Sequence, residues 1–163
     1  MSKLSKNSPV QFKVQVWIYC FDASKGAYQV LTLLTTQERG SFWQPVTGSV
    51  NPGESLTEAA WREAQEETGL RFHSGPQALS GAFEFQSRWG GLVQEHAFMV
   101  EAQAREDGAA PLVVLDAHEH VDYQWRSVEE AFGLLHYASN QEKLTQVAQI
   151  LNNEALINKQ SKT

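Results

Sequence analysis

The sequence predicts a single mixed α/β domain, with strands on both sides of an acidic helix. Three observations predict it. The chain has 163 residues, 42% hydrophobic and 20% charged, which suits one folded domain and excludes disorder. Hydrophobic side chains alternate with polar ones over residues 10–20, the period of a strand. From residue 55 the spacing becomes helical. We expect one domain over residues 1–163, with polar ends at about 1–8 and 158–163.

The N-terminal part of the chain predicts a hairpin. Turn residues at 22–28 separate the first strand from a second at 28–35. Residues 42–50 predict a short extended segment that leads towards the helix. The alternating apolar residues of the first strand are Val10, Phe12, Val14, Val16, Ile18 and Cys20.

The helix has start and stop signals at both ends. Ser55 and Glu58 fit a capping box, in which the hydroxyl and the carboxylate satisfy free backbone N–H groups. Gly69 follows the last turn as a left-handed C-terminal cap. Because small residues let a helix approach a sheet closely, we expect one side of it to pack on strands. That side carries Leu56, Ala59, Ala60 and Ala64.

The second half of the chain predicts a mixture of strands and helices. Residues 81–89 and 92–102 read as strands paired through a turn, and residues 112–115 and 121–125 as shorter strands. A helix capped by Ser127 is expected over 127–138. A last helix is expected from Asn140, with its apolar face formed by Leu144, Val147, Ile150 and Leu151.

Composition excludes several classes of function. The formal net charge of −6 argues against broad binding to nucleic acid. The single cysteine, Cys20, excludes an internal disulfide and a cysteine-based zinc site. The polar start lacks the apolar stretch of a signal peptide, and no apolar run is long enough to span a bilayer. We therefore expect a cytoplasmic protein with no membrane partner.

The helix carries an unusual density of negative charge. Four glutamates fall within ten residues, accompanied by one arginine and no lysine. Glu63 and Glu67 are one turn apart, Glu66 lies beside them, and Arg62 is four residues before Glu66. One interpretation is a solvated acidic face, which is common. The other is a site for a hard divalent cation such as Mg²⁺, which takes oxygen ligands together with water and substrate phosphates.

The spacing of these residues distinguishes the two interpretations. The segment resembles the Nudix box, G-x5-E-x7-R-E-U-x-E-E-x-G-U, where U is aliphatic. Its seven fixed residues would all match by chance at a given starting position less than about once in ten million trials. The matching residues are Gly48, Glu54, Arg62, Glu63, Ala64, Glu66, Glu67, Gly69 and Leu70.

The resemblance to the Nudix family implies a fold, a reaction and a set of roles. The fold is an α/β/α sandwich with a mixed sheet, and the reaction is Mg²⁺- or Mn²⁺-dependent hydrolysis of a small-molecule phosphoanhydride. Glu63 and Glu67 are the implied metal ligands, with Glu66 and the carbonyl of Gly48. Arg62 would orient the carboxylates, and Glu54 and Gly69 are structural in the motif. The general base is Glu66, Glu67 or a residue outside the motif, and a homodimer is a candidate assembly.

Two shorter stretches are similar to a group within the family, the bacterial dihydroneopterin triphosphate diphosphatases. These stretches are the run Phe42-Trp43-Gln44 before the box and Glu119-His120 at the start of "EHVDYQW". The resemblance implies that Glu119 is an extra metal ligand or the base. The Phe42–Gln44 run could hold a planar pterin or purine, whereas Trp43 could instead be a core residue.

The chain also departs from that group at two places. The arginine that commonly follows the second strand is missing, and Arg39 is the nearest replacement. The stretch from residue 85 to 96 is short, which leaves Arg88 as the main cation there for a triphosphate.

Four functions follow from these patterns. The leading one is a pyrophosphohydrolase that converts a (deoxy)nucleoside or pterin triphosphate to a monophosphate and pyrophosphate. The alternatives are a dinucleoside polyphosphate (Ap4A-type) hydrolase and a house-cleaning hydrolase of damaged nucleotides. A non-catalytic nucleotide-binding module is the least favoured, because binding alone does not need Glu63, Glu66 and Glu67 together.

Overall fold

The computed structural model describes residues 10–88 and 90–160, with side chains up to residue 154. Its strands are β1 (Gln11–Asp22), β2 (Ala27–Thr35), β3 (Trp43–Gln44), β4 (Val46–Ser49), β5 (Gln77–Ala78), β6 (Phe83–Gln86), β7 (Leu92–Glu101) and β8 (His120–Arg126). Its helices are the short 3-10 helix η1 (Gln37–Arg39), α1 (Leu56–Thr68), α2 (Val128–Leu134) and α3 (Ala138–Gln160).

The described strands form one mixed sheet around β1. Five of them follow the order β3-β2-β1-β7-β5, while β4 pairs with β1, β6 with β7 and β8 with β2. β1 and β7 run parallel over nine residue pairs, and the other pairings are antiparallel. β1 pairs with β2 at its C-terminal end and with β4 at its N-terminal half. The edge of β1 is therefore shared by β2 and β4, and the end of α1 meets the start of β8, where Glu67 lies close to Glu119 and His120.

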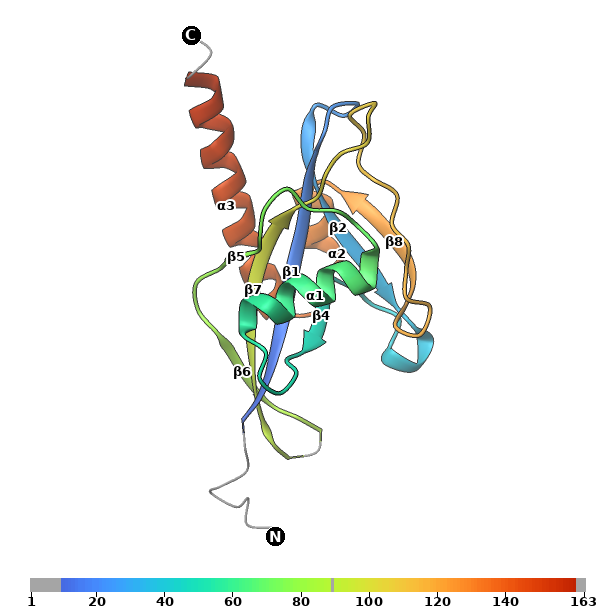
Figure 1. Ribbon diagram of the computed structural model, residues 1–163, viewed down its shortest axis with the longest axis vertical. Helices are drawn as coiled ribbons and strands as arrows, with labels where there is room; N and C mark the ends of the chain where they lie inside the picture. The colour runs from blue at the N-terminus through green and yellow to red at the C-terminus, as the bar shows by residue number, and fades with distance from the viewer. Residues whose placement is uncertain (1–9, 89, 161–163) are drawn as a thin grey trace.

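Helices cover both faces of the sheet, which confirms the expected sandwich (Figure 1). β1 supplies both cores, because its successive side chains point to opposite faces. Val16 and Ile18 pack in the core beneath α1, whereas Trp17 and Tyr19 pack against α2 and α3. The expected alternation is present, but the second face is buried as well because α3 lies across it.

Helix α1 packs through its small residues as expected. Ala59, Ala60 and Ala64 are fully buried on the sheet. The hydroxyl of Ser55 accepts a hydrogen bond from the backbone N–H of Glu58, and Gly69 ends the helix at a φ of 65°. The Ser55 and Gly69 caps agree with the sequence, and of the expected capping box the bond to the Ser55 hydroxyl is the half found among the described residues.

The C-terminal elements agree with expectation except at their edges and in one loop. α2 is capped by Ser127, and α3 begins two residues before Asn140 and continues through 158–160. β6 is shorter than the strand expected over 81–89, and Trp89 lies outside the described residues, as do 1–9 and 161–163. β5 had no clear signal in the sequence. Helix α3 buries Leu144, Val147 and Leu151, with Ile150 partly buried.

The strand expected at residues 112–115 is wrong. This segment is an extended loop with no strand partner. The backbone N–H of Val114 donates to the carbonyl of Thr68 at 2.9 Å, so the segment satisfies the C-terminal end of α1 instead of a ladder. Val113 is buried in the core under α1, while Leu112 and Val114 are exposed. An apolar run alone could not distinguish these two arrangements.

No helix in the described ranges is both long and apolar enough to cross a membrane.

Candidate active site

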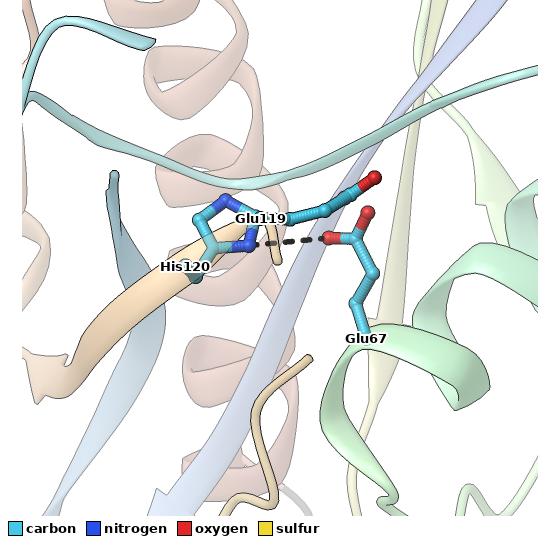
Figure 2. Close-up of side chains that lie close together, drawn as sticks. All are labelled: Glu67, Glu119 and His120. Carbon is cyan, nitrogen blue, oxygen red and sulfur yellow. Dashed lines mark ion pairs between the residues drawn. The ribbon is translucent and has the colours of Figure 1, made fainter. Parts of the chain in front are cut away.

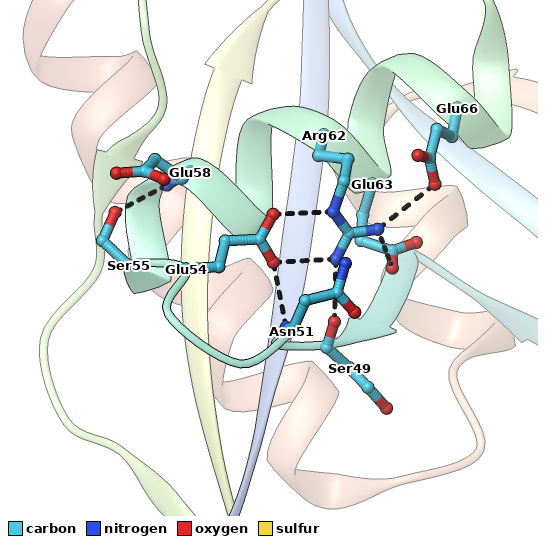
Figure 3. Close-up of polar contacts among 8 residues, drawn as sticks. All are labelled: Ser49, Asn51, Glu54, Ser55, Glu58, Arg62, Glu63 and Glu66. Carbon is cyan, nitrogen blue, oxygen red and sulfur yellow. Dashed lines mark hydrogen bonds and ion pairs between the residues drawn. The ribbon is translucent and has the colours of Figure 1, made fainter.

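Arg62 is the centre of a hydrogen-bond network beside α1 (Figure 3). Its guanidinium donates to both carboxylate oxygens of Glu54, at 2.7 and 2.9 Å, in the paired geometry that a planar guanidinium favours. It also donates to Glu63 at 2.8 Å and to Glu66 at 3.2 Å. A fifth bond reaches the backbone carbonyl of Ser49 at 2.9 Å. One side chain therefore ties the segment before α1 to two glutamates of the helix.

Glu54 braces this segment as the motif implies. Besides the two bonds from Arg62, its carboxylate accepts one from the backbone N–H of Asn51 at 3.0 Å. The hydrogen bonds from Arg62 are the main cause, and that from Asn51 the next, of a pKa lowered to about 2. Glu54 is therefore ionised at neutral pH, where it forms a paired ionic contact with Arg62.

Gly48 lies in β4 against the side chain of Glu63. A Cβ atom on Gly48 would overlap the carboxyl group of Glu63. The φ angle of Gly48 is not one of the positive values that favour glycine, so the need for glycine is one of space. Burial raises the pKa of Glu63, and the hydrogen bond from Arg62 opposes that rise. The Glu63 carboxylate is thus held between a strand backbone and a guanidinium.

The end of α1 and the start of β8 bring Glu67, Glu119 and His120 together (Figure 2). One carboxylate oxygen from each glutamate and one imidazole nitrogen lie within 4.8 Å of one another. The Nδ1 atom of His120 is 3.8 Å from a carboxylate oxygen of Glu67. We call these three residues the Glu67 cluster. Glu67 is more than fifty residues before Glu119 and His120 in the sequence, and the pairing of β8 with β2 helps to bring them together.

Glu67 is a buried carboxyl group without a hydrogen-bond partner. Its side chain is 3% exposed, and neither of its oxygens has a partner among the described residues. Burial raises its pKa to about 10, and the neighbouring Glu119 and Glu63 add to the rise. Such a group is costly to bury unless something neutralises its charge. This is the strongest single indication of a missing positive partner.

His120 is buried beside Glu67 and also contacts Gln44. The Nε2 atom of His120 is 3.1 Å from the Nε2 atom of Gln44. With the Gln44 amide assigned in this orientation, the imidazole Nε2 is an acceptor, which places the proton of a neutral ring on Nδ1. Burial lowers the pKa of His120, which favours that neutral ring. Its Nδ1–H then faces Glu67 at 3.8 Å, which is too long for a hydrogen bond, and Nδ1 has no other partner among the described residues.

The remaining charged residues divide between two sides of the site. Arg39, at the end of η1, lies 3.6 Å from the carboxylate of Glu119. Glu66 is largely exposed and pairs with Arg62, so its carboxylate is not in the Glu67 cluster. The structure therefore brings Glu67 and Glu119 together and holds Glu63 nearby, while Glu66 lies at the outer edge.

The donor set fits a hard divalent cation. Carboxylate oxygens are the ligands that Mg²⁺ and Mn²⁺ prefer in proteins. The two oxygens of Glu67 without partners and the adjacent Glu119 carboxylate offer such ligands at one point. A cation there would stabilise the ionised form of Glu67, which burial disfavours.

The comparison with protein families decides the assignment. The NUDIX domain family matches residues 11–148, which include every residue of the motif. The chain belongs to the Nudix family. The resemblance expected from the motif is thereby confirmed, and the Glu67 cluster lies where the Nudix helix ends.

Solved structures of Nudix hydrolases share this fold. A Nudix hydrolase from Listeria monocytogenes is 25% identical, with a TM-score of 0.72 over 90% of this chain and 97% of that chain. An Ap4A hydrolase from C. elegans is 22% identical, with a TM-score of 0.72 over 88% and 99%. The dihydroneopterin triphosphate pyrophosphohydrolase of E. coli is 24% identical, with a TM-score of 0.65 over 90% and 99%. The last two likenesses concern the fold alone.

The chain is also similar to part of a longer protein that is named for another activity. An octanoyltransferase of Myxococcus xanthus is 38% identical over 109 residues, which are 63% of this chain. The chain spans only 28% of the length of that protein.

The expected substrate-binding residues of this Nudix chain lie in different surroundings. Gln44 is buried and lines a cavity of about 460 Å³. The ring of Phe42 packs against His136 and Tyr137, and the Trp43 ring is covered by a guanidinium at 4.6 Å, that of Arg126. Arg88 is exposed in the turn between β6 and β7. Of the run Phe42-Trp43-Gln44, Gln44 is thus the member that lines this cavity.

Glu95 and Asn140 also line this cavity, and neither they nor Gln15, which bonds both, is marked as a site residue by a pattern in the sequence. Gln15 is buried in β1, and its amide donates to Glu95 at 2.8 Å and to Asn140 at 2.6 Å. Gln15 and Asn140 are 125 positions apart, so no local pattern could have paired them. A polar residue within a strand buried on both faces is the signal that could have identified Gln15.

Proposed function

We propose that the chain is a divalent-metal-dependent pyrophosphohydrolase. Its substrate is a (deoxy)nucleoside or pterin triphosphate, and its products are the monophosphate and pyrophosphate. The observation that carries the proposal is the buried, partnerless carboxyl group of Glu67 beside Glu119, at the end of the helix with the family motif. A protein that only bound nucleotides would gain nothing from keeping this costly group.

The residues that would hold the cation are Glu63, Glu66, Glu67, Glu119 and the backbone carbonyl of Gly48. The cation, Mg²⁺ or Mn²⁺, neutralises phosphate oxygens and lowers the pKa of a bound water when it is present. The described contacts favour Glu63 and Glu67 as the fixed ligands. Both are shielded from solvent, whereas the Glu66 side chain is 60% exposed.

In the reaction, water forms a bond to one phosphorus, and the phosphoanhydride bond of that phosphorus breaks. Pyrophosphate leaves, and the proton of the water passes to a carboxylate. Glu119 is well placed to accept this proton, because its side chain is 30% exposed and lies within the Glu67 cluster. Arg39 would meet the charge of the phosphates from the outer side. Glu66 and Glu67 are the other candidates for the base.

A second candidate is hydrolysis of a dinucleoside polyphosphate. Tyr123 and Trp125 follow Glu119 and His120 on β8, a pattern similar to that of the Ap4A-type enzymes in the family. The indole of Trp125 already donates to the carbonyl of Pro111 at 2.8 Å. The 460 Å³ cavity suits a single bicyclic ring, which favours a mononucleotide or pterin substrate.

The test is a substrate panel with product identification. Dihydroneopterin triphosphate, dATP, 8-oxo-dGTP, diadenosine tetraphosphate and ADP-ribose are incubated with Mg²⁺ or Mn²⁺, and products are separated by chromatography. We expect pyrophosphate from at least one triphosphate, abolished in Glu67→Gln. Glu58→Gln is the matched control, since Glu58 is an exposed glutamate of the first turn of α1. No turnover of any member with either cation would overturn the proposal. Cytoplasmic location, assembly and the extent of the domain stay predictions.

A further inference from the structure

A second group of polar residues lies on the face of the sheet that α3 covers. It belongs to the 460 Å³ cavity lined by Lys13, Gln44, Phe83, Phe85, Glu95 and Asn140, together with neighbouring residues. We call this cavity the α3-side pocket. Gln44 connects the pocket to the Glu67 cluster, because its amide also contacts His120. A ligand with its ring in the pocket could therefore extend its phosphates past Gln44 towards the glutamates.

The polarity of this pocket is fixed by a residue beneath it, Trp17. An indole N–H can only donate a hydrogen bond, and Trp17 is fully buried, so its partner must present an acceptor. That partner is the Oε1 atom of Gln15, at 2.7 Å. The amide nitrogen of Gln15 must then point the other way, where it donates to Glu95 and Asn140. Reversing the amide would leave a buried N–H unpaired.

The hydrogen bonds from the Gln15 amide fix the orientation of Asn140 and engage one oxygen of Glu95. Asn140 accepts from Gln15 through Oδ1, so its NH₂ group is the part left to bind a ligand. Glu95 accepts through Oε1, and its second oxygen remains an acceptor. Neither the Asn140 NH₂ nor the second Glu95 oxygen has a hydrogen-bond partner within the described part of the chain. The pocket thus offers a donor from Asn140 beside an acceptor from Glu95.

A complementary ligand edge has a carbonyl oxygen beside a ring N–H. This is a lactam, as found in guanine, hypoxanthine and the oxidised or reduced pterins. Adenine presents the opposite pattern, with an amino donor beside a ring-nitrogen acceptor. The rings of Phe83 and Phe85 lie 5.9 Å apart, line the same pocket and are half exposed, so they offer a surface on which a planar ring can stack.

We propose that the α3-side pocket selects substrates whose ring carries a lactam edge, with Asn140 and Glu95 as the specificity-determining residues. Gln15 and Trp17 act as positioning residues that hold the polarity of these two groups. The proposal rests on the proposed function for the presence of phosphates on the ligand. The contacts to the ring are independent of the metal and of hydrolysis.

The test measures binding of three monophosphates, GMP, IMP and AMP, to the metal-free protein in EDTA by NMR titration. IMP has the lactam edge but lacks the 2-amino group of GMP. We expect GMP and IMP to bind within about threefold of each other and AMP at least about tenfold more weakly. With AMP bound, the Asn140 donor and the Glu95 acceptor would face groups of their own kind and stay unpaired. Equal binding of all three, tighter binding of AMP, or no binding would overturn the proposal. Because nothing is hydrolysed, this result does not depend on turnover.

Two variants separate the contact that Asn140 makes to the ligand ring from the role of Trp17, which fixes the orientation of the Gln15 amide. Asn140→Asp keeps the acceptor for Gln15 and removes the donor, so the preference of GMP over AMP should fall about tenfold. Trp17→Phe keeps most of the packing and frees the Gln15 amide to reverse, so the same preference should fall towards one. Trp125→Phe is the matched control, since its indole N–H donates to Pro111 outside the pocket. An unchanged preference for GMP over AMP in Asn140→Asp would overturn the role given to Asn140, whether or not Trp17→Phe folds.

Discussion

Replacing Gly48 by alanine tests whether the position of the Glu63 carboxylate depends on the bare backbone of β4. The added Cβ atom would overlap the Glu63 carboxyl group, whereas ordinary contact begins at 3.4 Å. The carboxyl group must therefore retreat by at least about 1 Å, a displacement that can cost roughly a hundredfold in rate at an active site. The retreat also disturbs the 2.8 Å bond from Arg62 to Glu63.

We expect Gly48→Ala to lower turnover by about a hundredfold and cation affinity by about 10- to 100-fold. The fold should be preserved, because the overlapping atoms are the flexible end of a side chain. A change of about 1 kcal/mol would shift the Tm by only roughly 2–4 °C in a chain of this size. Initial rates under saturating Mg²⁺, cation titration and thermal unfolding together measure these quantities.

Gly133→Ala is the matched control for this variant. Gly133 lies in α2, and a Cβ atom there would meet no other atom within 4 Å. Its turnover should equal that of the unmodified protein. A folded Gly48→Ala with unchanged turnover and cation affinity would refute the steric argument, since Glu63 would then have no need of the exposed strand backbone.

Two further predictions concern the stability of the metal-free protein. Glu67→Gln should raise the Tm in EDTA at pH 8, by roughly 3–10 °C for about 1–3 kcal/mol. Burial raises the pKa of Glu67 to about 10, so its carboxyl group must take up a proton on folding at pH 8, and the amide need not. A lower Tm in a scanning fluorimetry assay would contradict this. The pKa of Glu54 is lowered from 4.5 to about 2, so its stabilising contribution is present above pH 4.5 and is lost as the pH falls from there towards 2. The free energies of urea unfolding of the unmodified protein and of Glu54→Gln should converge towards the acid end of this window. A constant difference between them across the window would argue that the Glu54–Arg62 pair does not stabilise the fold.

Much of the site could be predicted from the sequence because its parts lie on one helix. The spacing of Arg62 and Glu66 predicts their ion pair, which the structure shows at 3.2 Å. Ser55 and Gly69 likewise predict the ends of α1 from local signals alone. Short-range rules suffice wherever both partners belong to the same turn or helix.

The rest depends on contacts that only the folded chain creates. Glu119 meets Glu67 because β8 pairs with β2 and its ladder shifts register between Leu34 and Thr35. The alternation in β1 made Gln15 look like one of a polar series, but α3 buries that face too. A periodic pattern reports which residues share a face, and it does not report what covers that face.

We infer that the buried carboxyl group of Glu67 is kept because it holds a divalent cation. The most direct measurement is a Mn²⁺ titration followed by electron paramagnetic resonance, which detects the free ion. The unmodified protein and Glu58→Gln should bind Mn²⁺ alike, and Glu67→Gln should bind it at least about tenfold more weakly. Equal affinity in all three would show that Glu67 does not hold the cation.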